Sequence, residues 1–250
     1  MQAETRNRAT PLIALESVSP EQHATLREGG AADVHYWESH PEEVKPFFKR
    51  FKAEIKEYYR AEQGRRCCYC SFELASDHST FDAEHVLDKN TYPQFMFDPN
   101  NLAASCRPCN RAKNKKSVLE EGTKTDRVPI QSVSYKIVHP HLDDWAHHLK
   151  FDEISRIVPV SGSAKGKITI DVCKISILNS ARLSDSFASG RRVAEKYLRQ
   201  FYEIRTLKKK REHLELLRAL AAQRNLAPAL AIVDRLAQEI AEEEAASANR

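Results

Sequence analysis

Apolar side chains recur at helical spacing in the part of the chain that precedes its cysteine-rich centre. The residues on this face are Val44, Phe47, Phe48, Phe51, Ile55, Tyr58 and Tyr59. Their spacing of three and four predicts a helix from about Glu42 whose apolar face packs in a core. The first residue of this helix is open, because Ser39 and Glu42 form a candidate capping box while Pro46 suits a first turn equally well.

A second helical pattern runs from about Arg191 to the end of the chain. The stripe residues are Val193, Tyr197, Phe201, Ile204, Leu207, Leu214, Leu217 and Ala221, and then Leu230, Val233, Leu236 and Ile240. A break at Asn225 to Pro228 predicts a helical hairpin with one stripe on each arm. The stripes need a cover, which is either the rest of the chain or a partner, including a second copy in an oligomer. Residues 242–250 are expected to fray.

The centre of the chain carries strand and turn signals. Phe81 to Val86 alternates well enough for a short strand, and Asp98-Pro99-Asn100 marks a turn. From Leu102 onward the residues suit a helix. We therefore predict a hairpin followed by a helix in this part of the chain.

Outside these segments the local signals are weaker. Residues 10–15 fit a short strand or an extended arm, and the rest of the chain up to about residue 39 has no clear period. Val, Ile, Ser and Thr are frequent at 128–138 and 154–173, which predicts short strands there. Within the second of these segments, 167–170 is expected to be a strand that leads into a helix over 175–179.

Together these patterns predict an α+β protein with helical N-terminal and C-terminal segments around a small mixed core. The predicted division is an N-terminal arm and helix at 1–60, the core at 61–122, a connector with short strands at 123–180 and the helical hairpin at 181–250.

The composition of the chain predicts the cellular compartment of the protein and the role of its cysteines. No apolar run is long enough to cross a bilayer, and the N-terminus lacks the pattern of a signal peptide, so we expect a cytoplasmic protein without a membrane partner. In that compartment the six cysteines favour metal binding over disulfides. The net charge of +4 does not by itself indicate nucleic acid, and the basic run Lys208 to Arg211 is typical of a solvated face.

Two C-x-x-C pairs frame the centre of the chain. Cys67 with Cys70 and Cys106 with Cys109 present four thiolates at the spacing that a tetrahedral zinc ion accepts. Four sulfurs leave no open position for water or substrate, so this zinc is predicted to be structural. Cys68 and Cys173 are predicted to be free thiols.

Side chains suited to phosphodiester hydrolysis lie between and just after these pairs. Glu84 and His85 are adjacent, Asn101 follows, and Asn110 comes directly after the last cysteine. Hydrolysis needs a base for the attacking water and a cation for the phosphate charge. A histidine near neutrality serves as the base, while carboxylate and amide oxygens suit a hard ion such as Mg²⁺.

The order C-x-x-C, Glu-His, Asn-Leu, C-x-x-C-Asn-x-x-Lys resembles the HNH endonuclease family. The resemblance implies a ββα-metal core in which His85 is the general base. It implies Glu84 and Asn110 as ligands of catalytic Mg²⁺ or Mn²⁺, with Asp82 as an alternative to Glu84. Asn101 matches the position that ties down the loop orienting the histidine.

A basic stretch begins within the last cysteine pair and lies next to the candidate site, and the resemblance implies DNA as the partner. The candidate phosphate-binding residues are Arg107, Arg111, Lys113, Lys115 and Lys116. Two other interpretations stay open: a zinc-stabilised nucleic-acid-binding module without catalysis, and an interaction protein whose helical tail does the work. Cleavage that depends on a divalent ion separates the first interpretation from both.

The downstream region carries a fainter likeness. It contains His-Pro-x-x-Asp-Asp at 139–144, a strand signal, and Thr169-Ile170 before Leu178-Asn179. These features resemble the HNH nuclease subunit of Septu-type bacterial anti-phage systems. That resemblance implies a defence function and an ABC-type ATPase as partner.

Overall fold

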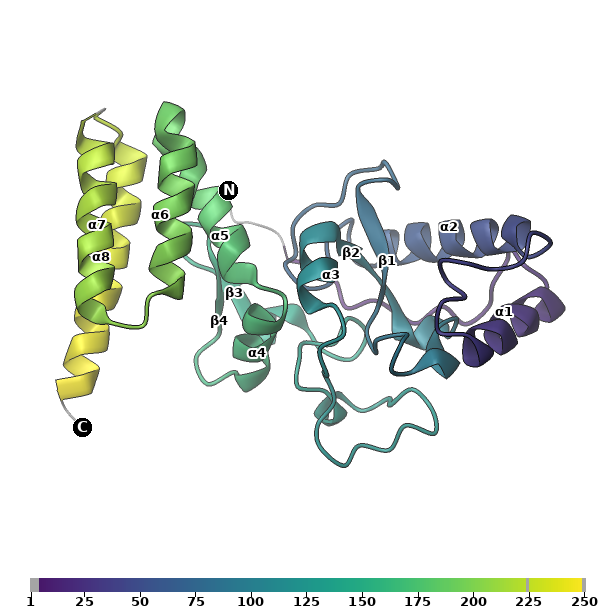
Figure 1. Ribbon diagram of the computed structural model, residues 1–250. Coiled ribbons are helices and arrows are strands. Elements are labelled where there is room, and N and C mark those ends of the chain that lie inside the picture. Colours follow the sequence, from purple (N-terminus) through teal and green to yellow (C-terminus); the bar gives the residue numbers. More distant parts are fainter. Residues whose placement is uncertain (1–4, 224, 249–250) are drawn as a thin grey trace. The chain divides into compact units, whose positions relative to one another are not determined.

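The computed structural model describes residues 5–223 and 225–248 and shows helices with two small sheets (Figure 1). The chain divides into two compact units. One comprises the described residues up to Lys150 together with Pro159–Lys174, and the other comprises Phe151–Val158 and the described residues from Ile175 onward. Helices and small sheets together confirm the predicted α+β class. Among the described helices, none is long and apolar enough to cross a membrane.

A β-hairpin with a short helix directly behind it lies at the centre of the first unit. Strand β1 (Phe81–His85) pairs antiparallel with β2 (Leu102–Cys106), from Phe81 opposite Cys106 to His85 opposite Leu102. Helix α3 (Arg107–Lys113) begins at the next residue. The predicted strand is therefore confirmed. The predicted helix from Leu102 is wrong over its first five residues, because these pair with β1.

Helix α2 (Lys45–Glu62) packs against this hairpin and buries the predicted face, including Phe51 and Ile55. Pro46 occupies its first turn, and no side chain caps its start, so the capping box at Ser39 is absent. Just beyond the helix, the Gln63 side chain accepts from Ala104 N at 2.9 Å and donates to Ala104 O at 2.8 Å. Gln63 thus satisfies backbone groups of β2 as a neighbouring strand would.

The N-terminal region holds a helix that the sequence pattern did not predict. Helix α1 (Pro20–Ala32) starts with a capping box between Ser19 and Gln22 but buries only Leu26 and Gly30. Because only two residues of this helix are buried, the sequence shows no helical repeat of apolar positions there. Residues 10–15 form an extended arm without strand pairing, and Leu12 N donates to the Tyr59 hydroxyl at 3.2 Å.

The segments that were expected to hold short strands match the prediction only in part. Residues 128–138 contain the 3₁₀ turn Ser132–Ser134 and one isolated β-bridge, from Tyr135 to Leu119, where strands were expected. The predicted strand at 167–170 lies in helix α4 (Ala164–Val172), because Ser163 caps that helix by accepting a hydrogen bond from Gly166 N. Strand β4 (Ile157–Pro159) does form, paired with β3 (Leu149–Phe151).

The second unit is helical and has its own core. It contains α5 (Ile175–Ser184), α6 (Arg191–Glu203), α7 (Leu207–Ala222) and α8 (Ala227–Ala248). The predicted hairpin consists of three helices, α6, α7 and α8, and α5 precedes them. Residues 204–206 interrupt its first arm, and the sequence did not reveal this break because it contains no glycine or proline. Helix α8 is regular to Ala248, so the expected fraying at 242–248 is wrong, and 249–250 lie outside the described residues.

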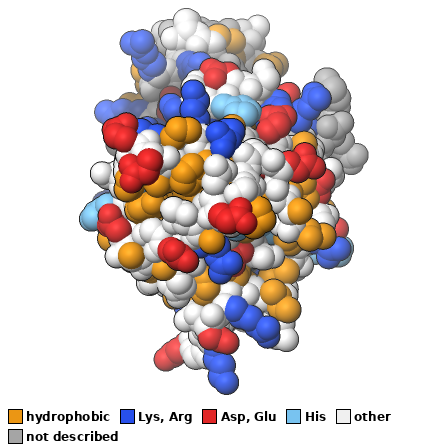
Figure 2. All heavy atoms as spheres, turned by 90° about the vertical axis from the view of Figure 1, so that its right-hand side faces the viewer, with side chains coloured by type: hydrophobic (Ala, Val, Ile, Leu, Met, Phe, Trp, Pro, Cys, Tyr) orange, Lys and Arg blue, Asp and Glu red, His pale blue; other side chains and the backbone are white. Residues whose placement is uncertain are grey.

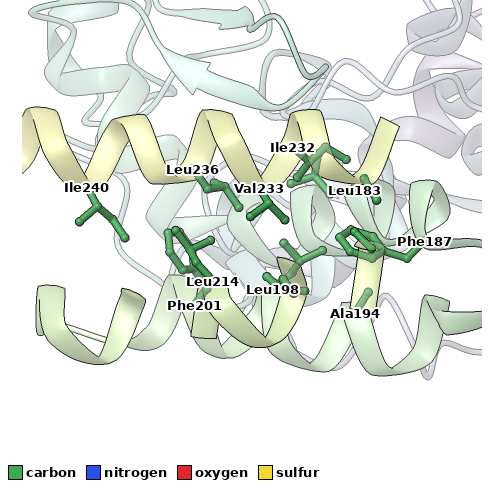
Figure 3. Packing of buried hydrophobic residues seen from close by; sticks show 13 residues of the cluster. Leu183, Phe187, Ala194, Leu198, Phe201, Leu214, Ile232, Val233, Leu236 and Ile240 are labelled. Atoms are coloured by element: carbon green, nitrogen blue, oxygen red, sulfur yellow. The ribbon is translucent and has the colours of Figure 1, made fainter. Parts of the chain in front are cut away.

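The apolar stripes of these helices cover one another. Figure 3 shows side chains of α8, among them Val233 and Leu236, directed at those of the helices that face them. The stripes thus find their cover within the unit. Val193 of the predicted stripe stays 47% exposed, and an oligomer through these helices stays a prediction.

Leu236→Ala should lower the free energy of unfolding of the second unit by about 2–5 kcal/mol, because it leaves a cavity in a closed core. Leu236 is fully buried. The matched control is Leu216→Ala, since Leu216 is 46% exposed and its truncation should change stability by no more than about 0.5 kcal/mol. Urea denaturation followed by circular dichroism measures both. Equal losses for the two variants would contradict the packing described above.

Candidate active site and zinc knuckle

The two cysteine pairs meet in one cluster, which we call the zinc knuckle. The sulfurs of Cys67, Cys70, Cys106 and Cys109 all lie within 4.8 Å of one another, and Cys70 Sγ lies 3.7 Å from Cys106 Sγ. Zinc–sulfur bonds of about 2.3 Å in a tetrahedron place the sulfurs about 3.8 Å apart. The cluster therefore fits a structural zinc ion. Cys68 and Cys173 lie outside it.

The hairpin brings the two pairs together. Cys67 and Cys70 lie in the turn after α2, whereas Cys106 ends β2 and Cys109 lies in α3. Cys106 N donates to Cys67 Sγ at 3.3 Å, and Cys68 N donates to Ala104 O at 3.0 Å. The knuckle is thus attached to β2 on the side that carries the second pair.

A cleft of about 380 Å³ opens beside the hairpin. Its walls come from β1, the segment after β1, α3, α2 and the turn at residue 37. The lining residues include Trp37, Lys52, Asp82, Glu84, His85, Asp88, Lys89, Asn110, Arg111, Lys113 and Asn114. The candidate base and both candidate metal ligands thus share one cleft.

His85 ends β1 and is 8% exposed. Its Nε2 lies 3.0 Å from the Met96 carbonyl oxygen, which only accepts, so Nε2 carries the proton and Nδ1 is the basic nitrogen. The Trp37 ring packs against the imidazole edge-to-face, with centroids 4.5 Å apart. Burial lowers the pKa of His85 to about 3. The imidazole is therefore neutral at physiological pH and can accept a proton, but burial makes it a weaker base than the near-neutral histidine expected from the sequence.

Glu84 is almost fully buried beneath the cleft. The Tyr69 hydroxyl donates to its Oε1 at 3.1 Å, and Lys113 Nζ lies 2.8 Å from the same oxygen. Burial raises the pKa of Glu84, while the Lys113 cation and the Tyr69 hydroxyl act in the opposite direction. Lys113 also donates to the His85 carbonyl at 2.8 Å and is 2% exposed. Lys113 is therefore too buried to be the phosphate contact that the sequence predicted.

Asn101 lies behind the cleft and is not among its lining residues. Its Oδ1 accepts from Leu87 N at 2.7 Å, and its Nδ2 donates to Leu87 O at 3.0 Å and Phe95 O at 3.1 Å. Fully buried, Asn101 ties both ends of the segment that leads from His85 to Met96.

Asn110 and Asp82 are hydrogen-bonded to each other in the cleft lining. Asn110 Nδ2 donates to Asp82 Oδ2 at 2.8 Å, which leaves the amide oxygen as an acceptor. The carboxylate of Glu84 and the amide oxygen of Asn110 form the hard donor set that Mg²⁺ prefers. These residues therefore fit such an ion. Asp82 has the role of a hydrogen-bond partner of Asn110 in this arrangement.

The predicted phosphate-binding residues divide between the cleft and the outer surface. Arg111 is exposed and lines the cleft, whereas Arg107, Lys115 and Lys116 are exposed outside its lining. Lys52 of α2 lines the cleft and was not predicted, because no local pattern separates it from other helix-surface lysines. The face shown in Figure 2 mixes acidic and basic side chains, so it does not mark a nucleic-acid surface by charge alone.

Comparison with known proteins detects a distant similarity. The chain matches no protein-family model. It is 26% identical over 135 residues to Septu protein PtuB of Bacillus thuringiensis, which is 54% of this chain and 43% of that protein. The chain therefore spans less than half the length of this curated relative.

Proposed function

We propose that this protein is a metal-dependent endonuclease with an HNH-type ββα-metal core. The observation that carries the proposal is the placement of His85, whose Nε2 is fixed by Met96 in a cleft shared with Glu84 and Asn110. The order of β1, β2 and α3 supports the core, and the zinc knuckle supports the subgroup with paired cysteines.

His85 acts as the general base in this proposal. Its Nδ1 takes a proton from a water molecule, whose oxygen attacks the phosphorus while the bond to the leaving oxygen breaks. The Trp37 edge and the Met96 carbonyl fix the ring, so the base needs no reorientation. Arg111 and Lys52 contact phosphates from α3 and α2.

Glu84 and Asn110 would hold the catalytic cation through a carboxylate and an amide oxygen. A bound Mg²⁺ ion supplies positive charge that offsets the charge on the phosphate and on the leaving oxygen. Asp82 orients Asn110 by accepting from its Nδ2. Asp82 stays the alternative ligand, because each carboxylate has one engaged oxygen: Asn110 contacts Asp82 Oδ2, and Tyr69 and Lys113 contact Glu84 Oε1.

The biological setting we propose is anti-phage defence. The distant similarity to a Septu protein supports it, together with the downstream motif at 139–144. In such a system the nuclease would act with an ABC-type ATPase on DNA.

Incubation of zinc-loaded protein with supercoiled plasmid tests the proposal. We expect nicked or linear product with Mg²⁺ or Mn²⁺ and intact plasmid with EDTA, in samples whose zinc content is checked by elemental analysis. The reaction is run with the protein alone and with the ATPase co-purified. DNA binding without cleavage in both arrangements would favour a nucleic-acid-binding module instead.

A further inference from the structure

We propose that Tyr69 is a positioning residue that holds Glu84 in its metal-binding orientation and so couples the zinc knuckle to the catalytic cleft. This inference rests on the proposed function, because it deepens the role of Glu84 in the same site. It concerns a residue between the two cysteines of the first pair, where the zinc ligands themselves require no particular side chain.

The hydrogen bond between Tyr69 and Glu84 is buried, and further contacts hold the backbone around Tyr69. Tyr69 is fully buried and Glu84 is 1% exposed, and the hydroxyl lies 3.1 Å from Glu84 Oε1. The Tyr69 carbonyl accepts from Trp145 Nε1 at 2.8 Å. The next residue, Cys70, belongs to the four-cysteine zinc knuckle. The phenol therefore has little freedom to leave the carboxylate.

Both partners of Glu84 use the same carboxylate oxygen. The Tyr69 hydroxyl and Lys113 Nζ contact Oε1, so Oε2 makes neither of these contacts. A buried carboxylate is stable only when it is hydrogen-bonded, and two donors on one oxygen also fix the rotation of the group. The Tyr69 hydroxyl supplies one of these two donors. Because the hydroxyl is neutral, it does not add a second positive charge beside Lys113 at a site that would bind a cation.

A side chain that is already held in position loses less conformational freedom when it binds a metal ion. Removing hydrogen-bond partners of metal ligands typically weakens metal affinity by about 10- to 100-fold. Tyr69→Phe removes a single oxygen atom and retains the ring, Lys113 and all four cysteines. We expect it to weaken Mn²⁺ binding, measured by electron paramagnetic resonance titration of zinc-loaded protein, by about 10- to 100-fold. The Mg²⁺ activation curve for cleavage should move by a similar factor.

Tyr135→Phe is the matched control. Tyr135 is 1% exposed, and its hydroxyl donates to Pro129 O at 2.9 Å, away from the cleft lining. It should lose a part-buried tyrosine hydrogen bond to a neutral carbonyl and keep wild-type Mn²⁺ affinity. Cleavage at saturating metal should stay close to the wild-type rate for Tyr135→Phe, and zinc should remain at about one per chain in both variants.

A double-mutant cycle with Glu84→Gln isolates the coupling. If Tyr69 acts through Glu84, then Tyr69→Phe should have little further effect on Mn²⁺ affinity in the Glu84→Gln background. An equal loss in both backgrounds would overturn the inference, as would loss of zinc or of folded structure in Tyr69→Phe.

The outcomes separate the two proposals. Wild-type protein that neither binds Mn²⁺ nor cleaves DNA, alone or with its ATPase, would contradict the proposed function. Wild-type protein that does both, beside a Tyr69→Phe variant indistinguishable from Tyr135→Phe, would overturn the role of Tyr69 and leave the nuclease standing.

Discussion

Replacing His85 with alanine should lower the rate of plasmid cleavage by about 10²- to 10⁴-fold, the range that a positioned general base contributes. The Met96 carbonyl holds the protonated Nε2, so the substitution removes Nδ1, the basic nitrogen. DNA binding should persist, because Arg111 and Lys52 remain in the lining. Single-turnover cleavage and electrophoretic mobility shift measure the two properties on the same preparation.

His141→Ala is the matched control for this experiment. His141 is 6% exposed, close to the 8% of His85, and its ring stacks on Tyr59 outside the cleft lining. Both variants lose a buried ring, so both should lose some thermal stability. Only His85→Ala should stop cleavage. Cleavage by His85→Ala at the wild-type rate, under conditions where the wild type is active, would remove the base assignment.

Cys106→Ser should abolish zinc retention and leave the first unit misfolded. Structural zinc contributes about 10–16 kcal/mol to folding in zinc-finger peptides, which is as large as the whole stability of a typical domain. Cys106 joins β2 to α3, and its backbone also donates to Cys67 Sγ. Loss of the ligand therefore affects the hairpin and the helix together. Elemental analysis and near-ultraviolet circular dichroism measure zinc content and tertiary structure.

Cys173→Ser separates loss of the metal from loss of a buried thiol. Cys173 is 1% exposed and lies outside the four-cysteine cluster. Burying its hydroxyl should destabilise the protein by about 1–3 kcal/mol while zinc stays at about one per chain. A Cys106→Ser protein that is soluble, zinc-free and normally folded would show that the knuckle is dispensable.

Patterns confined to short stretches of the chain predicted its elements well. The spacing of Phe48, Phe51, Ile55 and Tyr59 predicted α2 and the face that it buries, because 3.6-residue periodicity is local. The alternation after residue 81 predicted β1 for the same reason. The two C-x-x-C pairs predicted a cluster of four thiols, which the fold assembles.

The errors fall where non-local contacts override local preference. Residues 102–106 read as helix by composition, yet pairing with β1 and the Gln63 amide make them a strand. The β-branched run at 168–170 read as strand, yet the Ser163 cap starts a helix before it. Helix α1 was missed because only two of its residues are buried. None of these contacts leaves a periodic signal in the sequence.

The candidate site shows the same difference between what local sequence patterns predict and what non-local contacts decide. By itself the sequence determined which side chains are candidates for the chemistry, since Glu84, His85 and Asn110 stand in a recognisable order inside the cysteine frame. Only the tertiary structure decided which of their atoms are available. Met96 binds one nitrogen of His85, and Tyr69 and Lys113 share one oxygen of Glu84. These partners are 11, 15 and 29 residues away in the chain, as counted in the sequence, and such hydrogen bonds exist only once packing has brought the segments together.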